Sequence, residues 1–66
     1  MKIRFIRNVL VEVEKTKLQE MWDYHYPKWK ELLVESINYS GKSATICTMD
    51  KDILADVPID SFEVVK

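Results

Sequence analysis

The stretch from Asp56 to Val65 constrains the fold more than any other part of this chain. A short apolar strand runs to Pro58, a tight turn follows, and a second short strand begins at Phe62. Proline has no backbone N–H to donate, so we expect the first of these strands to end there. A strand, one tight turn and a last short strand are typical of the way a small β-barrel closes.

The first segment of the chain also predicts a strand. Its apolar residues fall at odd positions and its polar residues mostly at even ones, which is the period-two pattern of a half-buried strand. The apolar positions are Ile3, Phe5, Val9, Val11 and Val13. Ile6 and Arg7 interrupt the alternation, and we therefore expect a bend or bulge near Asn8.

Three more strands are predicted over residues 32–39, 44–49 and 53–57, where β-favouring residues are separated by two polar turns. Gly41, in the first of these turns, can adopt the positive φ that a tight hairpin requires. The sequence therefore predicts an all-β fold, a five-stranded barrel that spans residues 1–66 as a single domain. We expect the barrel to be lined by Leu32, Val34, Ile46, Val57 and Phe62.

The segment from Lys15 to Trp29 allows two interpretations. Leu18, Met21, Trp22 and His25 follow helical spacing, and Pro27 would end such a helix, which predicts one short helix between residues 16 and 26. The alternative is a long irregular loop that folds back on the barrel. Both interpretations remain open from the sequence.

Composition limits the possible functions. The chain has one cysteine and one histidine, so we expect no internal disulfide, no metal site and no cofactor. It lacks a glycine-rich phosphate loop and a nucleophile motif, which argues against an enzyme. Its apolar runs are too short to span a membrane, and Arg4 and Arg7 interrupt the start, unlike a signal peptide. We therefore expect a cytoplasmic protein.

The order of the predicted elements resembles the Src-homology-3-like barrel, most clearly over residues 28–66. Residues 29–35 resemble the second strand of that fold with its lead-in, and residues 57–62 resemble its valine–proline turn. The resemblance implies a small five-stranded barrel. Of the groove in the peptide-binding branch, only Pro58 and Phe62 find a counterpart here. Ser43 and Ala44 stand where that branch has its tryptophan pair, so recognition of proline-rich peptides is not implied.

The candidate binding site is an aromatic cluster. Four of the seven aromatic residues lie close together: Trp22, Tyr24, Tyr26 and Trp29. Tyrosine and tryptophan are enriched in binding hot spots, and Trp22, Tyr24 and Tyr26 would share one side of an extended segment. The alternative is that these rings cap the barrel and enlarge a thin core, or that the tryptophans are inside and the tyrosines outside.

Two functions follow from this cluster. The first is a non-catalytic interaction or assembly module that binds a protein partner or a second copy through these rings, rimmed by Lys28, Lys30, Asp23 and Glu20. The second is a nucleic-acid-associated accessory protein, with lysines on phosphates and rings stacked on bases. The balanced charge, ten basic against eleven acidic residues, favours the first.

Overall fold

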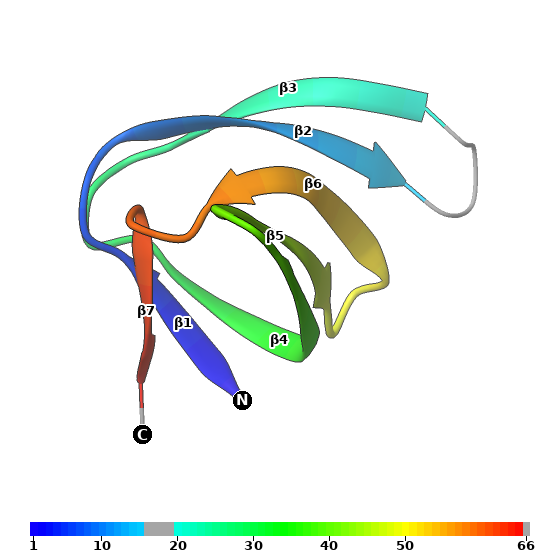
Figure 1. The fold of residues 1–66 in the computed structure, drawn as a ribbon. Helices are drawn as coiled ribbons and strands as arrows, with labels where there is room; N and C mark the ends of the chain where they lie inside the picture. The colour runs from blue at the N-terminus through cyan, green and yellow to red at the C-terminus, as the bar shows by residue number, and fades with distance from the viewer. Residues whose placement is uncertain (16–19, 66) are drawn as a thin grey trace.

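The computed structural model describes residues 1–15 and 20–65, and these form a small all-β domain. Seven strands follow one another along the chain (Figure 1): β1 Lys2–Phe5, β2 Val9–Lys15, β3 Glu20–Tyr26, β4 Glu31–Ser40, β5 Ser43–Thr48, β6 Asp52–Pro58 and β7 Phe62–Val65. All pairings are antiparallel, and the strands form one open sheet in the order β3-β2-β6-β5-β4-β1-β7. β3 and β7 therefore lie at its two ends.

The predicted helix between residues 16 and 26 is wrong over residues 20–26, which form strand β3, and the described residues contain no helix. The loop interpretation is wrong over the same residues. The segment is extended because β2 supplies a full antiparallel partner, from Lys15 opposite Glu20 to Val9 opposite Tyr26. Helical spacing of apolar residues does not outweigh such a ladder, since propensity yields to tertiary context. Residues 16–19 of the proposed helix lie outside the described residues.

The strand count also differs from the five that the sequence predicts. The predicted first strand is divided by bends at Ile6 and Arg7 into β1 and β2, which confirms the expected break near Asn8. β3 is an additional strand. The remaining four predicted strands are present as β4 to β7, with bounds shifted by a residue or so at some ends.

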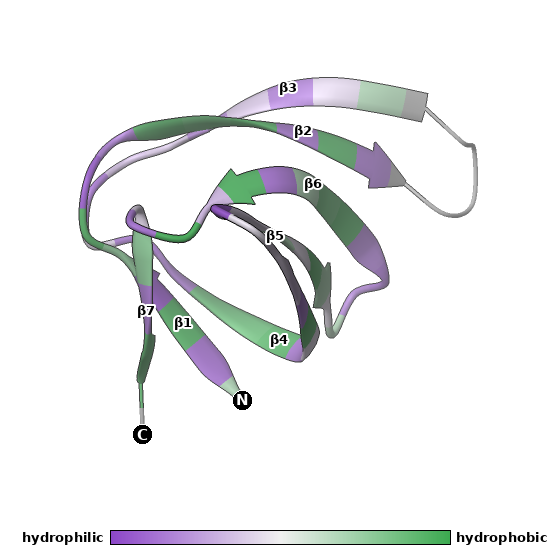
Figure 2. Ribbon diagram, in the orientation of Figure 1, coloured by the Kyte–Doolittle hydropathy of each residue, from purple (hydrophilic) through white to green (hydrophobic). Residues whose placement is uncertain are grey.

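The core lies on one face of the curved sheet. Among the described residues its buried apolar members come from every strand except β3: Ile3, Phe5, Val9, Val11, Val13, Val34, Ala44, Ile46, Leu54, Val57 and Phe62. Four of the five predicted lining residues are in this set, and Leu32 is partly buried against it. Figure 2 shows the corresponding alternation of hydrophobic and hydrophilic positions along β1 and along the later part of β2.

The turns form where the sequence predicts them. Gly41 has φ of 62° in the β4–β5 turn. In the β6–β7 turn the Ser61 N–H donates to the Pro58 carbonyl at 3.0 Å, and the Ser61 hydroxyl donates to the same oxygen at 2.5 Å. Ser61 is fully buried, and the hydrogen bond from its hydroxyl satisfies this polar side chain inside the fold.

Candidate functional site

Trp22, Tyr24 and Tyr26 form an aromatic row on β3, and this row lies on the same face of the sheet as the buried valines of β2. Trp22 is opposite Val13 and Tyr24 is opposite Val11, and residues opposite each other in an antiparallel pair point to the same side. Trp22 is nevertheless 51% exposed and Tyr24 39% exposed. The row therefore extends the apolar face beyond the core and presents two large rings at the surface.

Tyr26 differs from the other two rings of the row because it reaches the core. It is partly buried, and its ring stacks on that of Phe5 with the centroids 5.0 Å apart. Burial raises the pKa of Tyr26, and the carboxylate of Asp52 and the neighbouring Tyr24 raise it further. Tyr26 therefore anchors the end of β3, and the exposed part of the row is Trp22 and Tyr24.

The opposite face of β3 is also exposed. Met21 is 59% exposed, and Asp23 and His25 are exposed on the same side. Their partners across the ladder on β2 are Glu14, Glu12 and Leu10, all of which are exposed. Strand β3 thus presents side chains to solvent on both of its faces.

The chain leaves β3 through a tight turn that holds Trp29 in an unusual conformation. The Lys30 N–H donates to the Pro27 carbonyl at 3.0 Å, which closes a four-residue turn, and Trp29 has φ of 75°. Glycine or asparagine is the usual residue at such a position of positive φ. The Trp29 N–H donates to the Phe5 carbonyl at 2.7 Å, and the Lys28 N–H to Asn8 Oδ1 at 2.7 Å, so the bend after β1 holds this turn.

Trp29 is 61% exposed, and two cationic side chains lie near its ring. Lys28 Nζ is 4.9 Å and Arg4 Cζ is 5.5 Å from the ring centroid, both within cation–π range. Arg4 also forms an ion pair with Glu63 on β7, and this hydrogen bond raises the pKa of Arg4. The contact fixes the ring at the surface, beside the pair of strands β1 and β7.

The structure separates the remaining predicted site residues. Lys30 is exposed next to Trp29, whereas Phe62 is 6% exposed and Pro58 is half-buried. Phe62 is therefore a core residue with little surface to offer a ligand. The side chain of Glu20, predicted for the rim, lies outside the described residues.

Sequence reasoning missed three residues of this surface, namely Arg4, Met21 and His25. The contact of Arg4 with Trp29 has no local sequence signal, because it depends on a turn that brings residue 29 back beside β1. Met21 and His25 were assigned to a helical stripe. Alternation within residues 20–26 was the signal that could have placed them on one face of a strand.

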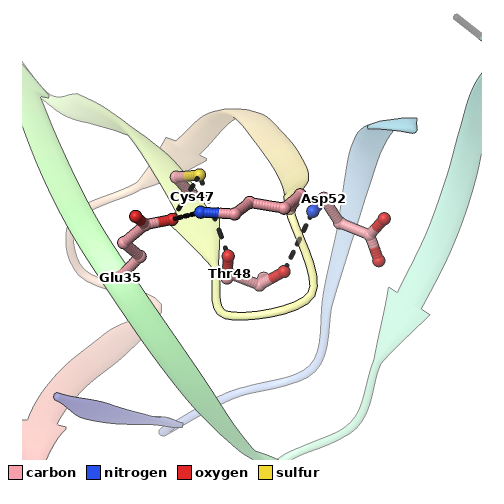
Figure 3. A network of polar contacts seen from close by, with 5 residues as sticks. Glu35, Cys47, Thr48 and Asp52 are labelled. Carbon is pink, nitrogen blue, oxygen red and sulfur yellow. Dashed lines mark hydrogen bonds and ion pairs between the residues drawn. The ribbon is translucent and has the colours of Figure 1, made fainter. Parts of the chain in front are cut away.

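A second polar cluster joins β4 to the β5–β6 turn (Figure 3). Lys51 Nζ is 2.7 Å from Glu35 Oε2, and the Cys47 thiol lies 3.7 Å from the same oxygen. The ammonium group of Lys51 lowers the pKa of Glu35 and is itself held charged, because Glu35 raises its pKa. The Asp52 N–H donates to Thr48 Oγ1 at 3.1 Å and closes the turn. These contacts tie the turn to β4.

The described residues contain no cluster of three histidine, cysteine or acidic residues that could hold a metal ion. In the same part of the chain no helix is long and apolar enough to cross a membrane. Comparison of the chain with protein-family models, with curated proteins and with solved structures finds no match.

Proposed function

We propose that this chain is a non-catalytic interaction or assembly module that binds a protein through the surface of strand β3. The observation that carries the proposal is the position of β3: it lies at one end of the strand order and bears the exposed rings of Trp22 and Tyr24. An edge strand can extend its ladder onto another chain, and large apolar side chains beside it add area and specificity.

The size of the protein supports this reading of the aromatic row. A chain of 66 residues has a thin core and gains from every large side chain it can bury. Trp22, Tyr24, Met21 and Trp29 are nevertheless each more than a third exposed. Tryptophan and tyrosine kept at the surface of so small a domain are the residue types that most often dominate binding energy.

We further propose that the sheet curves into a partly open Src-homology-3-like barrel, which closes where Tyr26 stacks on Phe5 and stays open along the rest of β3. The bend at residues 6–8 carries the chain from β1, which pairs with β4 and β7, to β2, which pairs with β3 and β6. The stacking of Tyr26 on Phe5 brings the end of β3 against β1. The tight turn before β7 supports the same architecture. Backbone and side-chain distances measured between β3 and β1 by NMR would test it.

Alanine substitutions at Trp22 and Tyr24 test the binding surface. Removing a true anchor costs about 2 kcal/mol or more, which weakens the dissociation constant roughly 30-fold. The matched control is Tyr39→Ala on β4, because Tyr39 is 58% exposed and lies on a different strand. Association is measured as self-association and as affinity capture from the native cell. Equal association of all three variants with the unchanged protein would place the surface elsewhere.

A nucleic-acid-associated function is the second candidate, and one contact favours it. The exposed ring of Trp29 lies beside the cationic groups of Lys28 and Arg4, an arrangement in which a base can stack and a phosphate can be neutralised. Such binding would weaken steeply with salt and would be lost in Trp29→Ala. Fluorescence anisotropy of a labelled single-stranded oligonucleotide at low salt measures it, and no change on titration would exclude this function.

A further inference from the structure

The position of β3 at the edge of the sheet suits one specific partner, a second copy of this chain, and this inference rests on the proposed function of β3. Among the described strands β3 pairs with β2 alone, over seven residues from Glu20 to Tyr26. Two copies can join such edges antiparallel around a two-fold axis. The joined ladder is then continuous with the existing β2–β3 ladder.

Symmetry limits how two β3 strands can be aligned. Residues opposite each other across an antiparallel pair point to the same face of the sheet. A two-fold axis perpendicular to the sheet keeps each side chain on its own face, so one residue of β3 has to lie directly opposite its own copy, with the axis passing between the two. Centring the axis on Asp23 would place two carboxylates directly opposite each other, which is destabilising. Centring it on His25 would leave only residues 24–26 of the two β3 strands opposite each other, whereas centring it on Tyr24 leaves residues 22–26.

Centring the axis on Tyr24 gives complementary pairs on both faces. Asp23 then lies opposite His25 of the second copy, where an imidazole N–H can donate to a carboxylate, and symmetry forms this pair twice. Asp23 is itself opposite Glu12 on β2, so the imidazole would approach two neighbouring carboxylates. On the other side of His25, the exposed Leu10 of β2 in the same copy lies opposite it.

The same alignment covers the exposed rings on the other face. Trp22 lies opposite Tyr26 of the second copy, and Tyr24 lies opposite its own copy. Because Val13 is opposite Trp22 and Val9 is opposite Tyr26 within each chain, the valine rows of the two cores would be joined by a continuous row of aromatic rings. Aromatic pairs opposite each other are among the favourable cross-strand pairs.

We propose that two copies of this chain join their β3 strands antiparallel, with Tyr24 on the two-fold axis and Asp23 opposite His25 of the second copy. In this alignment residues 22–26 of the two β3 strands lie opposite each other, and pairing of five residues from each copy involves less surface than the roughly 800 Å² per partner of a standard interface. We therefore expect a dissociation constant in the micromolar range.

A charge swap tests the alignment. His25→Asp places carboxylates opposite each other, and Asp23→His removes the acceptor, so each change is expected to weaken dimerisation at least about tenfold. The double variant Asp23→His with His25→Asp restores both pairs and should return the dissociation constant to within about threefold of the unchanged chain. Asn38→Asp is the matched control, because it adds a carboxylate at an exposed position of β4. Sedimentation equilibrium measures all four, with circular dichroism to confirm that each folds.

Disulfide trapping gives a second, independent readout. In a Cys47→Ser background, Tyr24→Cys would place two thiols on opposed residues about 4.5–5.5 Å apart at Cα, which a disulfide can span. Trp22→Cys would place them four positions apart along the strand, about 13 Å, which a disulfide cannot span. Mild oxidation should therefore give a covalent dimer from Tyr24→Cys and little from Trp22→Cys.

Three results would overturn the proposal: a monomer at concentrations up to about 500 µM, single charge variants that dimerise normally, or a double variant that stays as weak as the singles. The proposed function can fail separately. It fails if Trp22→Ala and Tyr24→Ala leave every association of the chain unchanged. If the chain is a monomer but these two changes abolish binding of a different protein, the proposed function stands and only the dimer is excluded.

Discussion

Strands β2 and β3 pair with each other, and each presents a row of apolar side chains on the same face of the sheet. The side chains of this row are buried on β2, whereas two of the three on β3 are exposed. Val9, Val11 and Val13 of β2 are at most 6% exposed, whereas Trp22 and Tyr24, directly across the ladder, are 51% and 39% exposed. β2 has a second neighbour in β6, and β3 is at the end of the sheet. Hydrophobicity alone therefore does not decide burial in this small domain, because the same face of the sheet is covered along β2 and open at Trp22 and Tyr24 of β3.

The largest loss of stability is expected at a buried leucine, and an exposed leucine serves as its matched control. Leu54 of β6, opposite Val13, is fully buried, whereas Leu10 of β2 is 65% exposed. Leu54→Ala should lower the free energy of unfolding by about 2–5 kcal/mol, because it leaves a cavity, and Leu10→Ala by less than about 1 kcal/mol. Urea denaturation measures both. Similar losses of unfolding free energy at the two positions would contradict the assignment of Leu54 to the core and of Leu10 to the surface.

The next effect concerns the turn that follows β3. Trp29→Gly and Trp29→Ala both remove the ring, but only glycine adopts φ of 75° without strain. The glycine variant should therefore be more stable than the alanine variant by about 1 kcal/mol in chemical denaturation. If the two variants unfold at the same urea concentration, the turn relaxes once the ring is gone, and Trp29 itself holds the backbone there.

Tyr26 is the residue of the aromatic row that packs against the core, where its ring stacks on Phe5. Its pKa is raised above the ordinary 10.0 by burial, then by Asp52 and by Tyr24. A group with a raised pKa in the fold contributes stability that is present below the ordinary value and lost as pH rises through the raised one. Tyr26→Phe should therefore lose less stability between neutral pH and pH above 10.0 than the unchanged chain. Parallel alkaline curves for the two proteins would contradict burial of this hydroxyl.

The smallest effect is expected at the exposed ion pair between Glu35 of β4 and Lys51 of the β5–β6 turn. The hydrogen bond and charge of Lys51 lower the pKa of Glu35 below its ordinary 4.5. The stabilisation is then complete above pH 4.5 and is lost as pH falls through the lowered pKa. Glu35→Gln should flatten the acid limb of the stability curve, and Lys51→Met should flatten the same part. Additive effects of the two changes would show that the pair does not act as a unit.

Prediction from sequence was most successful where a local pattern and the tertiary structure agree. Alternation placed Ile3, Phe5 and Val13 inside, and Gly41 and Pro58 marked turns, because backbone geometry at these residues depends on neighbours in the chain. Prediction failed for residues 20–26, because the apolar residues there fit both the spacing of a helix and the alternation of a strand. The pairing partner of this segment decided between them, and that partner is not encoded within the segment.

The sequence alone determined an all-β domain with a break near Asn8, a tight turn after Pro58 and a core that includes Val34, Ile46 and Val57. These depend on periodicity and on the restricted backbone of glycine and proline. Only the tertiary structure decided that β3 is a strand at the edge of the sheet, that Trp22 and Tyr24 remain at the surface, and that Arg4 meets Trp29. These depend on which strands become neighbours, and neighbours across a sheet are set by long-range packing rather than by residues adjacent in the chain.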